Sequence, residues 1–196
     1  MDENKLRNLL RDKPVLILLI IILALGIFVR MYDYNLVGMW NDDMSTIPSG
    51  LLWFYQHTYY PGLAGQGEPA LGNLIVGAGC MMSGQDFSNV QKIAPMYYPG
   101  REVLLGKQIT SSIGWCRAPG VIFGILLLFL VAILALLVID KYAALLVTAF
   151  YAFYPPLMQL STFIHVDVFG YVFVAASLIS LYLFYEAQLG STKEKI

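Results

Sequence analysis

Long uninterrupted apolar runs dominate the chain, and four of them are long enough, or nearly so, to cross a bilayer. The runs predict spans at about residues 14–30, 118–139, 142–160 and 168–187. A helix needs roughly 20 apolar residues to cross a hydrocarbon core of about 30 Å. The first run is slightly short, but Lys13 and Arg30 flank it, and both side chains can extend to the membrane surface. The predicted fold is therefore all-α and integral to the membrane.

The first and third runs each allow a second interpretation. A basic segment precedes the first run, as in a signal peptide, but no small-residue cleavage pattern follows the run, so a membrane anchor is favoured. The third run leads into Pro155-Pro156, which end or kink a helix. Beyond the prolines, His165 and Asp167 would be costly inside lipid. Two spans joined by a short turn therefore explain residues 142–187 better than one continuous span.

Residues 31–117 form a long loop between the first two spans. The loop is rich in tyrosine and tryptophan, which favour the membrane interface. Its pattern predicts two helices lying against the membrane. One covers residues 45–56, with Pro48 near its first turn and Ser45 or Thr46 as a cap. The other covers residues 70–82, and its apolar run is too short to span.

Composition narrows the class of protein further. The 196 residues are 58% hydrophobic and 13% charged, and their mean hydropathy is +0.67. A soluble domain is about 45–50% apolar and about 25% charged, so a soluble enzyme and a disordered chain are excluded. The net charge of -1 excludes a nucleic-acid binder with a basic face. The two cysteines are too few for a disulfide framework or a metal cluster.

The distribution of lysine and arginine predicts the orientation. Cations gather in residues 1–13, in residues 190–196 and at Lys141, all in short segments between or beside the spans. The positive-inside rule then places the N-terminus and the C-terminal tail in the cytoplasm. The long loop and the turn at residues 165–167 share the opposite side. We expect a multi-pass protein of a prokaryotic plasma membrane rather than of the endoplasmic reticulum.

Several polar residues on the outer side are candidates for chemistry. Asp42 and Asp43 are adjacent, and we expect their repulsion to raise the pKa of one carboxyl, which suits a general base near neutral pH. The alternative is a solvated pair that caps the next helix. Glu68 precedes the second loop helix, where the backbone dipole alone can stabilise a carboxylate.

The remaining candidates flank the later spans. His165 and Asp167 stand at alternating positions, so both can point at one ligand or metal, or simply mark the water boundary. Arg117 precedes an apolar span, where it is either an interfacial anchor or an inward-facing partner for a phosphate. None of these residues is specific by itself, whereas their order along the chain is.

That order resembles the N-terminal part of a GT-C glycosyltransferase, closest to the protein O-mannosyltransferases and their prokaryotic relatives. The resemblance covers roughly residues 15–188. It rests on four motifs in register: Asn41-Asp42-Asp43, the segment from Glu68 to Ile75, the segment from Arg117 to Gly124, and Tyr154-Pro155-Pro156 with residues 161–167. Enzymes of this type have many more spans than four, so we expect the chain to be a truncated reading frame or one part of a longer protein.

The resemblance implies roles for the matching positions. Asp42 falls at the catalytic aspartate and Asp43 at its acidic neighbour. Arg117 falls at an arginine associated with the lipid phosphate of the donor. Asp167 falls where related enzymes carry a second acidic motif, and with His165 and Glu68 it is expected to bind substrate or a divalent metal. Glu68 departs from the histidine or lysine of the family.

The implied reaction is transfer of a hexose such as mannose from a polyprenyl phosphate to a hydroxyl of a protein or glycolipid acceptor, with inversion, on the non-cytoplasmic side. A positioned carboxylate takes the hydroxyl proton, and a cation stabilises the leaving phosphate. The partners expected are therefore the lipid-linked sugar, its acceptor and membrane lipid, and not nucleic acid. The alternatives are a non-catalytic membrane protein that binds a lipid-linked sugar or a partner, and a transporter fragment with His165 and Asp167 on a polar pathway.

Overall fold

The computed structural model describes residues 8–34, 41–57, 70–87 and 113–193. All regular structure in these segments is helical. The helices are α2 (Lys13–Asp33), α3 (Asn41–Gln56), α4 (Ala70–Met81), α6 (Ile113–Val138), α7 (Lys141–Phe153), α8 (Pro155–Thr162) and α9 (Asp167–Lys193). Helices α2, α6 and α9 are long and apolar enough to cross a membrane, and the bent pair α7–α8 makes a fourth candidate. The predicted all-α membrane fold is confirmed.

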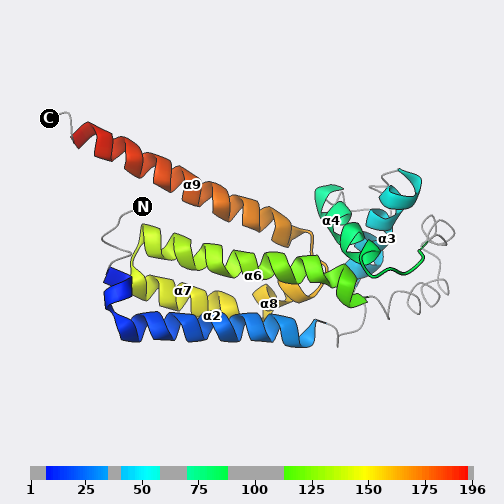
Figure 1. The fold of residues 1–196 in the computed structure, drawn as a ribbon, viewed down its shortest axis with the longest axis horizontal. Helices are drawn as coiled ribbons and strands as arrows, with labels where there is room; N and C mark the ends of the chain where they lie inside the picture. Colours follow the sequence, from blue (N-terminus) through cyan, green and yellow to red (C-terminus); the bar gives the residue numbers. More distant parts are fainter. Residues whose placement is uncertain (1–7, 35–40, 58–69, 88–112, 194–196) are drawn as a thin grey trace.

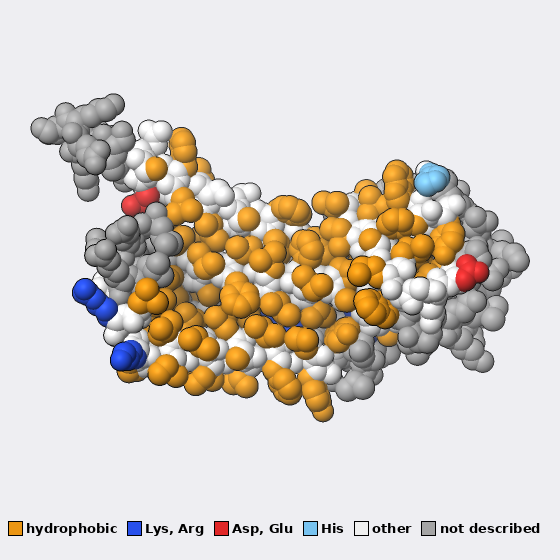
Figure 2. All heavy atoms as spheres, in the orientation of Figure 1, with side chains coloured by type: hydrophobic (Ala, Val, Ile, Leu, Met, Phe, Trp, Pro, Cys, Tyr) orange, Lys and Arg blue, Asp and Glu red, His pale blue; other side chains and the backbone are white. Residues whose placement is uncertain are grey.

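The apolar runs predict the positions of the long helices, but the observed helix ends differ from the predicted ones. The span expected from residue 118 belongs to a helix that begins at Ile113, so Trp115, Cys116 and Arg117 are helical. The run at residues 142–160 is split into α7 and α8, which meet at a bend of 63°. Helix α9 continues to Lys193, beyond the predicted end of the fourth run. Apolar side chains cover the face along these helices (Figure 2), as contact with lipid requires.

The long helices lie lengthwise and the short loop helices gather at one end (Figure 1). Helix α2 packs on α7 and α6, while α6 also packs on α9, α4 and α8. Both ends of the described chain and the α6–α7 turn lie at the left in this view, and α3 and α4 lie at the right. We call these the cationic end and the loop-helix end.

Capping by carboxylates defines the cationic end. Asp12 caps α2 by accepting a hydrogen bond from the backbone N–H of Val15, and it forms a salt bridge with Lys141 at the start of α7. This hydrogen bond with the ammonium group lowers the pKa of the Asp12 carboxyl. Asp140 caps α7 by accepting from the N–H groups of Tyr142 and Ala143, at 2.9 and 2.8 Å. The starts of α2 and α7 are thus fastened together.

The break between α7 and α8 follows from the two prolines. In a continuous helix the carbonyls of Tyr151 and Ala152 would accept from the N–H groups of residues 155 and 156. Pro155 and Pro156 have no N–H, so both carbonyls lose their partners. The Arg30 guanidinium supplies the missing donors: Nη2 donates to the Tyr151 oxygen at 3.0 Å and Nη1 to the Ala152 oxygen at 3.2 Å.

Arg30 is therefore an internal residue, and its predicted position at the membrane surface is wrong. Its side chain is 0% exposed. It runs back along α2, where Nη1 also donates to the Gly26 carbonyl at 3.0 Å, and the guanidinium lies 5.1 Å from the centre of the Tyr151 ring. The reason is that carbonyls inside lipid have no water to replace a lost partner, so they attract the nearest cationic donor.

Replacing Arg30 with leucine should lower the free energy of unfolding by about 1–3 kcal/mol, because two carbonyls of α7 then have no donor. In a Pro155→Ala/Pro156→Ala background the same change should cost less, because residues 155 and 156 regain their N–H groups. Unfolding of the four proteins in lipid micelles measures this difference. An equal cost in both backgrounds would contradict the assignment of Arg30 to these carbonyls.

Candidate functional site

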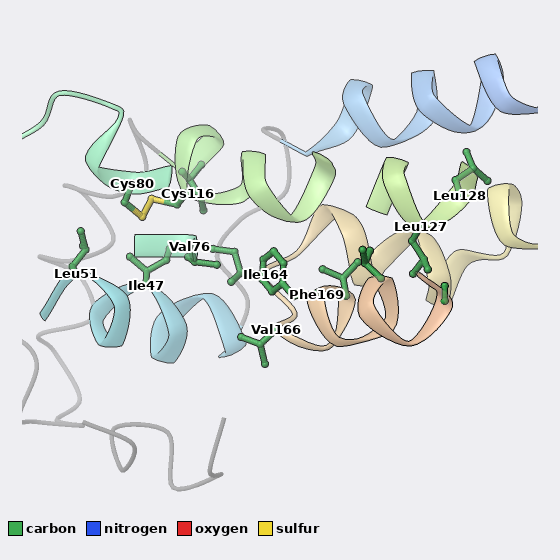
Figure 3. Close-up of a cluster of buried hydrophobic side chains, with 14 of the residues drawn as sticks. Ile47, Leu51, Val76, Cys80, Cys116, Leu127, Leu128, Ile164, Val166 and Phe169 are labelled. Atoms are coloured by element: carbon green, nitrogen blue, oxygen red, sulfur yellow. A yellow bond between two sulfur atoms is a disulfide. The ribbon is translucent and has the colours of Figure 1, made fainter. Parts of the chain in front are cut away.

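Helices α3 and α4 cross so closely that their backbones touch. A methyl group added to Gly50 of α3 would collide with the Asn73 carbonyl oxygen and would lie 2.8 Å from the Gly77 nitrogen. A methyl group on Gly77 of α4 would lie 2.6 Å from the Gly50 carbonyl oxygen. Buried side chains of Ile47 and Val76 surround the crossing (Figure 3). The two predicted loop helices are thus one packed unit.

Helix α3 begins earlier than the sequence predicts, and this changes the place of the acidic pair. It starts at Asn41 rather than near Ser45, so Asp42 and Asp43 lie in its first turn and Thr46 is a buried helical residue instead of a cap. Pro48 lies inside the helix. The side chains of Asp42 and Asp43 lie outside the described residues. Their position in the first turn is one where the helix dipole favours negative charge.

A disulfide between Cys80 and Cys116 joins the end of α4 to the start of α6. Next to it, a methyl group on Gly79 would lie 2.6 Å from the Trp115 carbonyl oxygen, so the two helices are also in close contact. Two cysteines are too few for a framework of several disulfides, and this single bridge was not predicted from the sequence. It fastens the α3–α4 unit to the bundle (Figure 3).

The connection between α8 and α9 completes the loop-helix end. A methyl group on Gly72, in the first turn of α4, would lie 2.7 Å from the side chain of Val166. On the other side, Gly124 of α6 has no room for a side chain because Ser161 packs against it. Three segments far apart in the sequence, namely the start of α4, the first half of α6 and residues 161–167, therefore meet here.

Arg117 is buried at this meeting point and bonds to the protein itself. Its side chain is 1% exposed. Nη1 donates to the Tyr34 carbonyl at 2.9 Å, and the guanidinium lies 5.5 Å from the centre of the Phe163 ring. Arg117 thus ties the end of α2 and the α8–α9 connection to α6. Its predicted contact with a donor phosphate stays a prediction.

Of the other predicted site residues, some lie in or next to the α8–α9 connection and some lie outside the described residues. His165 is half-buried in the α8–α9 connection, and Asp167 is exposed in the first turn of α9. Glu68 lies outside the described residues, two positions before the start of α4. Within the described segments no three His, Cys, Asp or Glu residues form a group that could hold a metal ion. The divalent metal stays a prediction, since three of the five candidate carboxylate and imidazole side chains lie outside the described residues: those of Asp42, Asp43 and Glu68.

Two contacts that organise this end were not predicted: the disulfide and the hydrogen bond from Arg117 to the Tyr34 carbonyl. Only a three-dimensional arrangement pairs residues that are 36 or 83 positions apart. Comparison of the chain with protein families, with curated proteins and with solved structures finds no match.

Gly50→Ala should destabilise the α3–α4 unit by about 1–3 kcal/mol, because the added methyl group has nowhere to go between two backbones. The matched control is Gly170→Ala on α9, where no atom lies within 4 Å of the added group. The control should be neutral or slightly stabilising, since alanine favours a helix over glycine. Unfolding curves and the protease sensitivity of α3 measure the difference, and equal curves would show that the helices do not touch.

The disulfide should leave no free thiol in the purified protein, because the chain has only two cysteines. A maleimide should label the unfolded protein only after reduction, and then twice. The Cys80→Ser/Cys116→Ser variant should lose about 3–4 kcal/mol of unfolding free energy, the value for a loop of this length. Two labels per chain before reduction would contradict the bridge.

Proposed function

We propose that the chain carries the active surface of a membrane glycosyltransferase of the GT-C type. It would transfer a hexose such as mannose from a polyprenyl phosphate to a hydroxyl acceptor at the loop-helix end. The observation that supports this is the convergence of the motif-bearing segments. The start of α4 meets Val166 between the candidate residues His165 and Asp167, and Arg117 packs on Phe163 of the same connection.

Asp42 is the proposed base. As the acceptor oxygen attacks the anomeric carbon, its proton passes to the Asp42 carboxylate, and the bond from the anomeric carbon to the phosphate oxygen breaks. The polyprenyl phosphate leaves with the electron pair, and attack from the opposite face inverts the anomeric centre. A carboxylate in the first turn of a helix is stabilised in its charged form, as the proposed base must be before it accepts the proton.

Arg117 is proposed as a positioning residue in this reaction. Its hydrogen bond to the Tyr34 carbonyl holds the end of α2. Asp42 is eight positions further along the sequence. The leaving phosphate would be stabilised by a bound divalent metal or by the imidazole of His165. A direct contact between Arg117 and the phosphate requires the guanidinium to leave Tyr34, which makes the positioning role the simpler proposal.

The proposed orientation places the loop-helix end outside the cytoplasm. Two independent observations support it. Disulfides form and persist in oxidising compartments, and Cys80–Cys116 lies at this end. The salt-bridged Lys141 and the cations Arg11 and Lys13 lie at the opposite end, where the positive-inside rule expects the cytoplasm. A prokaryotic plasma membrane satisfies both conditions.

A membrane protein that binds the lipid-linked sugar without chemistry is the second candidate. The burial of Arg117 favours it, because a guanidinium that is 1% exposed holds the fold together rather than a reacting phosphate. Both candidates predict donor binding at the loop-helix end. Only the transferase requires the carboxylate of Asp42.

Asp42→Asn should abolish sugar transfer, because an amide cannot take the acceptor proton. The assay adds a polyprenyl-phosphate mannose with a labelled sugar to membranes that contain the full chain, and measures labelled acceptor and released polyprenyl phosphate. The matched control is Asp86→Asn, which removes an exposed carboxylate after α4 at the same end. The control should retain activity.

Donor binding, measured as a rise in the unfolding temperature, separates the two candidates. Stabilisation by the donor with transfer that depends on Asp42 supports the transferase. Stabilisation without transfer in the unaltered protein supports the binding protein and rejects the transferase. If the donor neither stabilises the protein nor reacts, both proposals are wrong.

A further inference from the structure

The cationic end contains an open pocket between the start of α2 and the α6–α7 turn. Its volume is about 670 Å³, within the range of about 300–1,000 Å³ for small-molecule sites. It is lined by polar residues and by three apolar ones. The lining residues are Asn8, Arg11, Asp12, Lys13, Pro14, Leu136, Ile139, Asp140 and Lys141. None of the predicted site residues takes part in it.

The charged side chains in this pocket differ in whether they already have a partner among the described residues. Both carboxylates are engaged: Asp12 by Lys141 and by the Val15 N–H, and Asp140 by two N–H groups at the start of α7. Lys141 is matched by its bond to Asp12. Arg11 and Lys13 are exposed, and the described segments give neither of them a carboxylate partner. The charge left for a ligand is therefore positive.

The pocket lies where a helical span begins. Pro14 opens the apolar run of α2, and Leu136 and Ile139 come from the last turn of α6 and its end. A ligand that fills it would meet cations on the water side and aliphatic side chains on the membrane side. An anionic phospholipid has this division, with a phosphate headgroup above its acyl chains, whereas a soluble phosphate has no apolar part.

We propose that this pocket binds the phosphate headgroup of an anionic membrane lipid, with Arg11 and Lys13 as its cationic contacts. The Arg11 fork can donate two parallel hydrogen bonds to phosphate oxygens, and Lys13 adds a point charge. The aliphatic side chains of Leu136 and Ile139 line the path of an acyl chain. Lipid held there bridges the start of α2 to the α6–α7 turn beside the Asp12–Lys141 salt bridge.

The test compares lipids in mixed micelles of the full chain. Phosphatidylglycerol should raise the unfolding temperature, and neutral phosphatidylcholine at the same concentration should not. Arg11→Gln/Lys13→Gln should weaken the phosphatidylglycerol effect at least about tenfold in the concentration required, since each cation near an anionic surface contributes measurably. Both side chains are exposed, so the variant should fold normally without added lipid.

The matched control is Lys193→Gln/Lys195→Gln, which removes the same charge from the C-terminal segment. It should leave the concentration of phosphatidylglycerol required almost unchanged. An equal loss in both double variants would show that any lysine or arginine near the membrane contributes equally, and would overturn the pocket as the binding site. Stabilisation by millimolar inorganic phosphate equal to that by phosphatidylglycerol would overturn the lipid as the ligand. Retention of one phosphatidylglycerol by the unaltered protein, but not by Arg11→Gln/Lys13→Gln, in native mass spectrometry would support it.

Discussion

The bond between Arg30 and the end of α7 is the constraint on which the arrangement of the bundle depends. A charged side chain inside a membrane is expensive, and two carbonyls without donors are expensive as well. Here each reduces the cost of the other, because one guanidinium donates hydrogen bonds to both carbonyls that the prolines leave unpaired. Gly26 permits this approach, because a methyl group there would lie 3.0 Å from the Ala152 side chain. With the end of α7 held against α2, α8 turns away by 63° while the Tyr151 and Ala152 carbonyls keep donors.

The bend determines what meets at the loop-helix end. Helix α8 carries Ser161 to Gly124 of α6, and the chain then turns so that Phe163 lies beneath Arg117 and Val166 lies against Gly72. The same α6 segment holds Tyr34 through Arg117 and α4 through the disulfide. Helix α6 is therefore the element to which all three other segments of this end are fastened. A straight α7–α8 helix would point residues 161–167 elsewhere, and the candidate residues His165 and Asp167 would lose their place beside α4.

How much of this the sequence predicts depends on the kind of information that each feature needs. The length of an apolar run indicates the length of a helix, so the long helices and the short α4 were predicted from local pattern. The two adjacent prolines likewise predicted the break at Pro155-Pro156. Local pattern does not show which way a flanking cation turns, so Arg30 was placed at the surface. The Tyr151 and Ala152 carbonyls that accept its hydrogen bonds are more than 120 residues away in sequence, and local pattern does not reveal them. The same limit applies to Cys80–Cys116 and to Arg117 with Tyr34. The start of α3 was misplaced because Pro48 resembles a first-turn proline, whereas the helix accommodates it internally. The candidate carboxylates Asp42, Asp43 and Glu68 rest on the order of motifs alone.

Helices α2 and α7 run in the same direction, since Asp12 meets Lys141 at their starts and Arg30 meets Ala152 near their ends. Parallel neighbours place like ends of their dipoles side by side, which is unfavourable unless charges compensate them. Carboxylates cap both starts, Asp12 on α2 and Asp140 on α7, and the guanidinium of Arg30 lies at the end of α7. The two carboxylates are engaged by Lys141 and by helix N–H groups, so Arg11 and Lys13 remain as further cations at the cationic end. The parallel pair thus explains why carboxylates gather at this membrane boundary. An anion bound by the neighbouring Arg11 and Lys13 would act on the joint between α2 and α7.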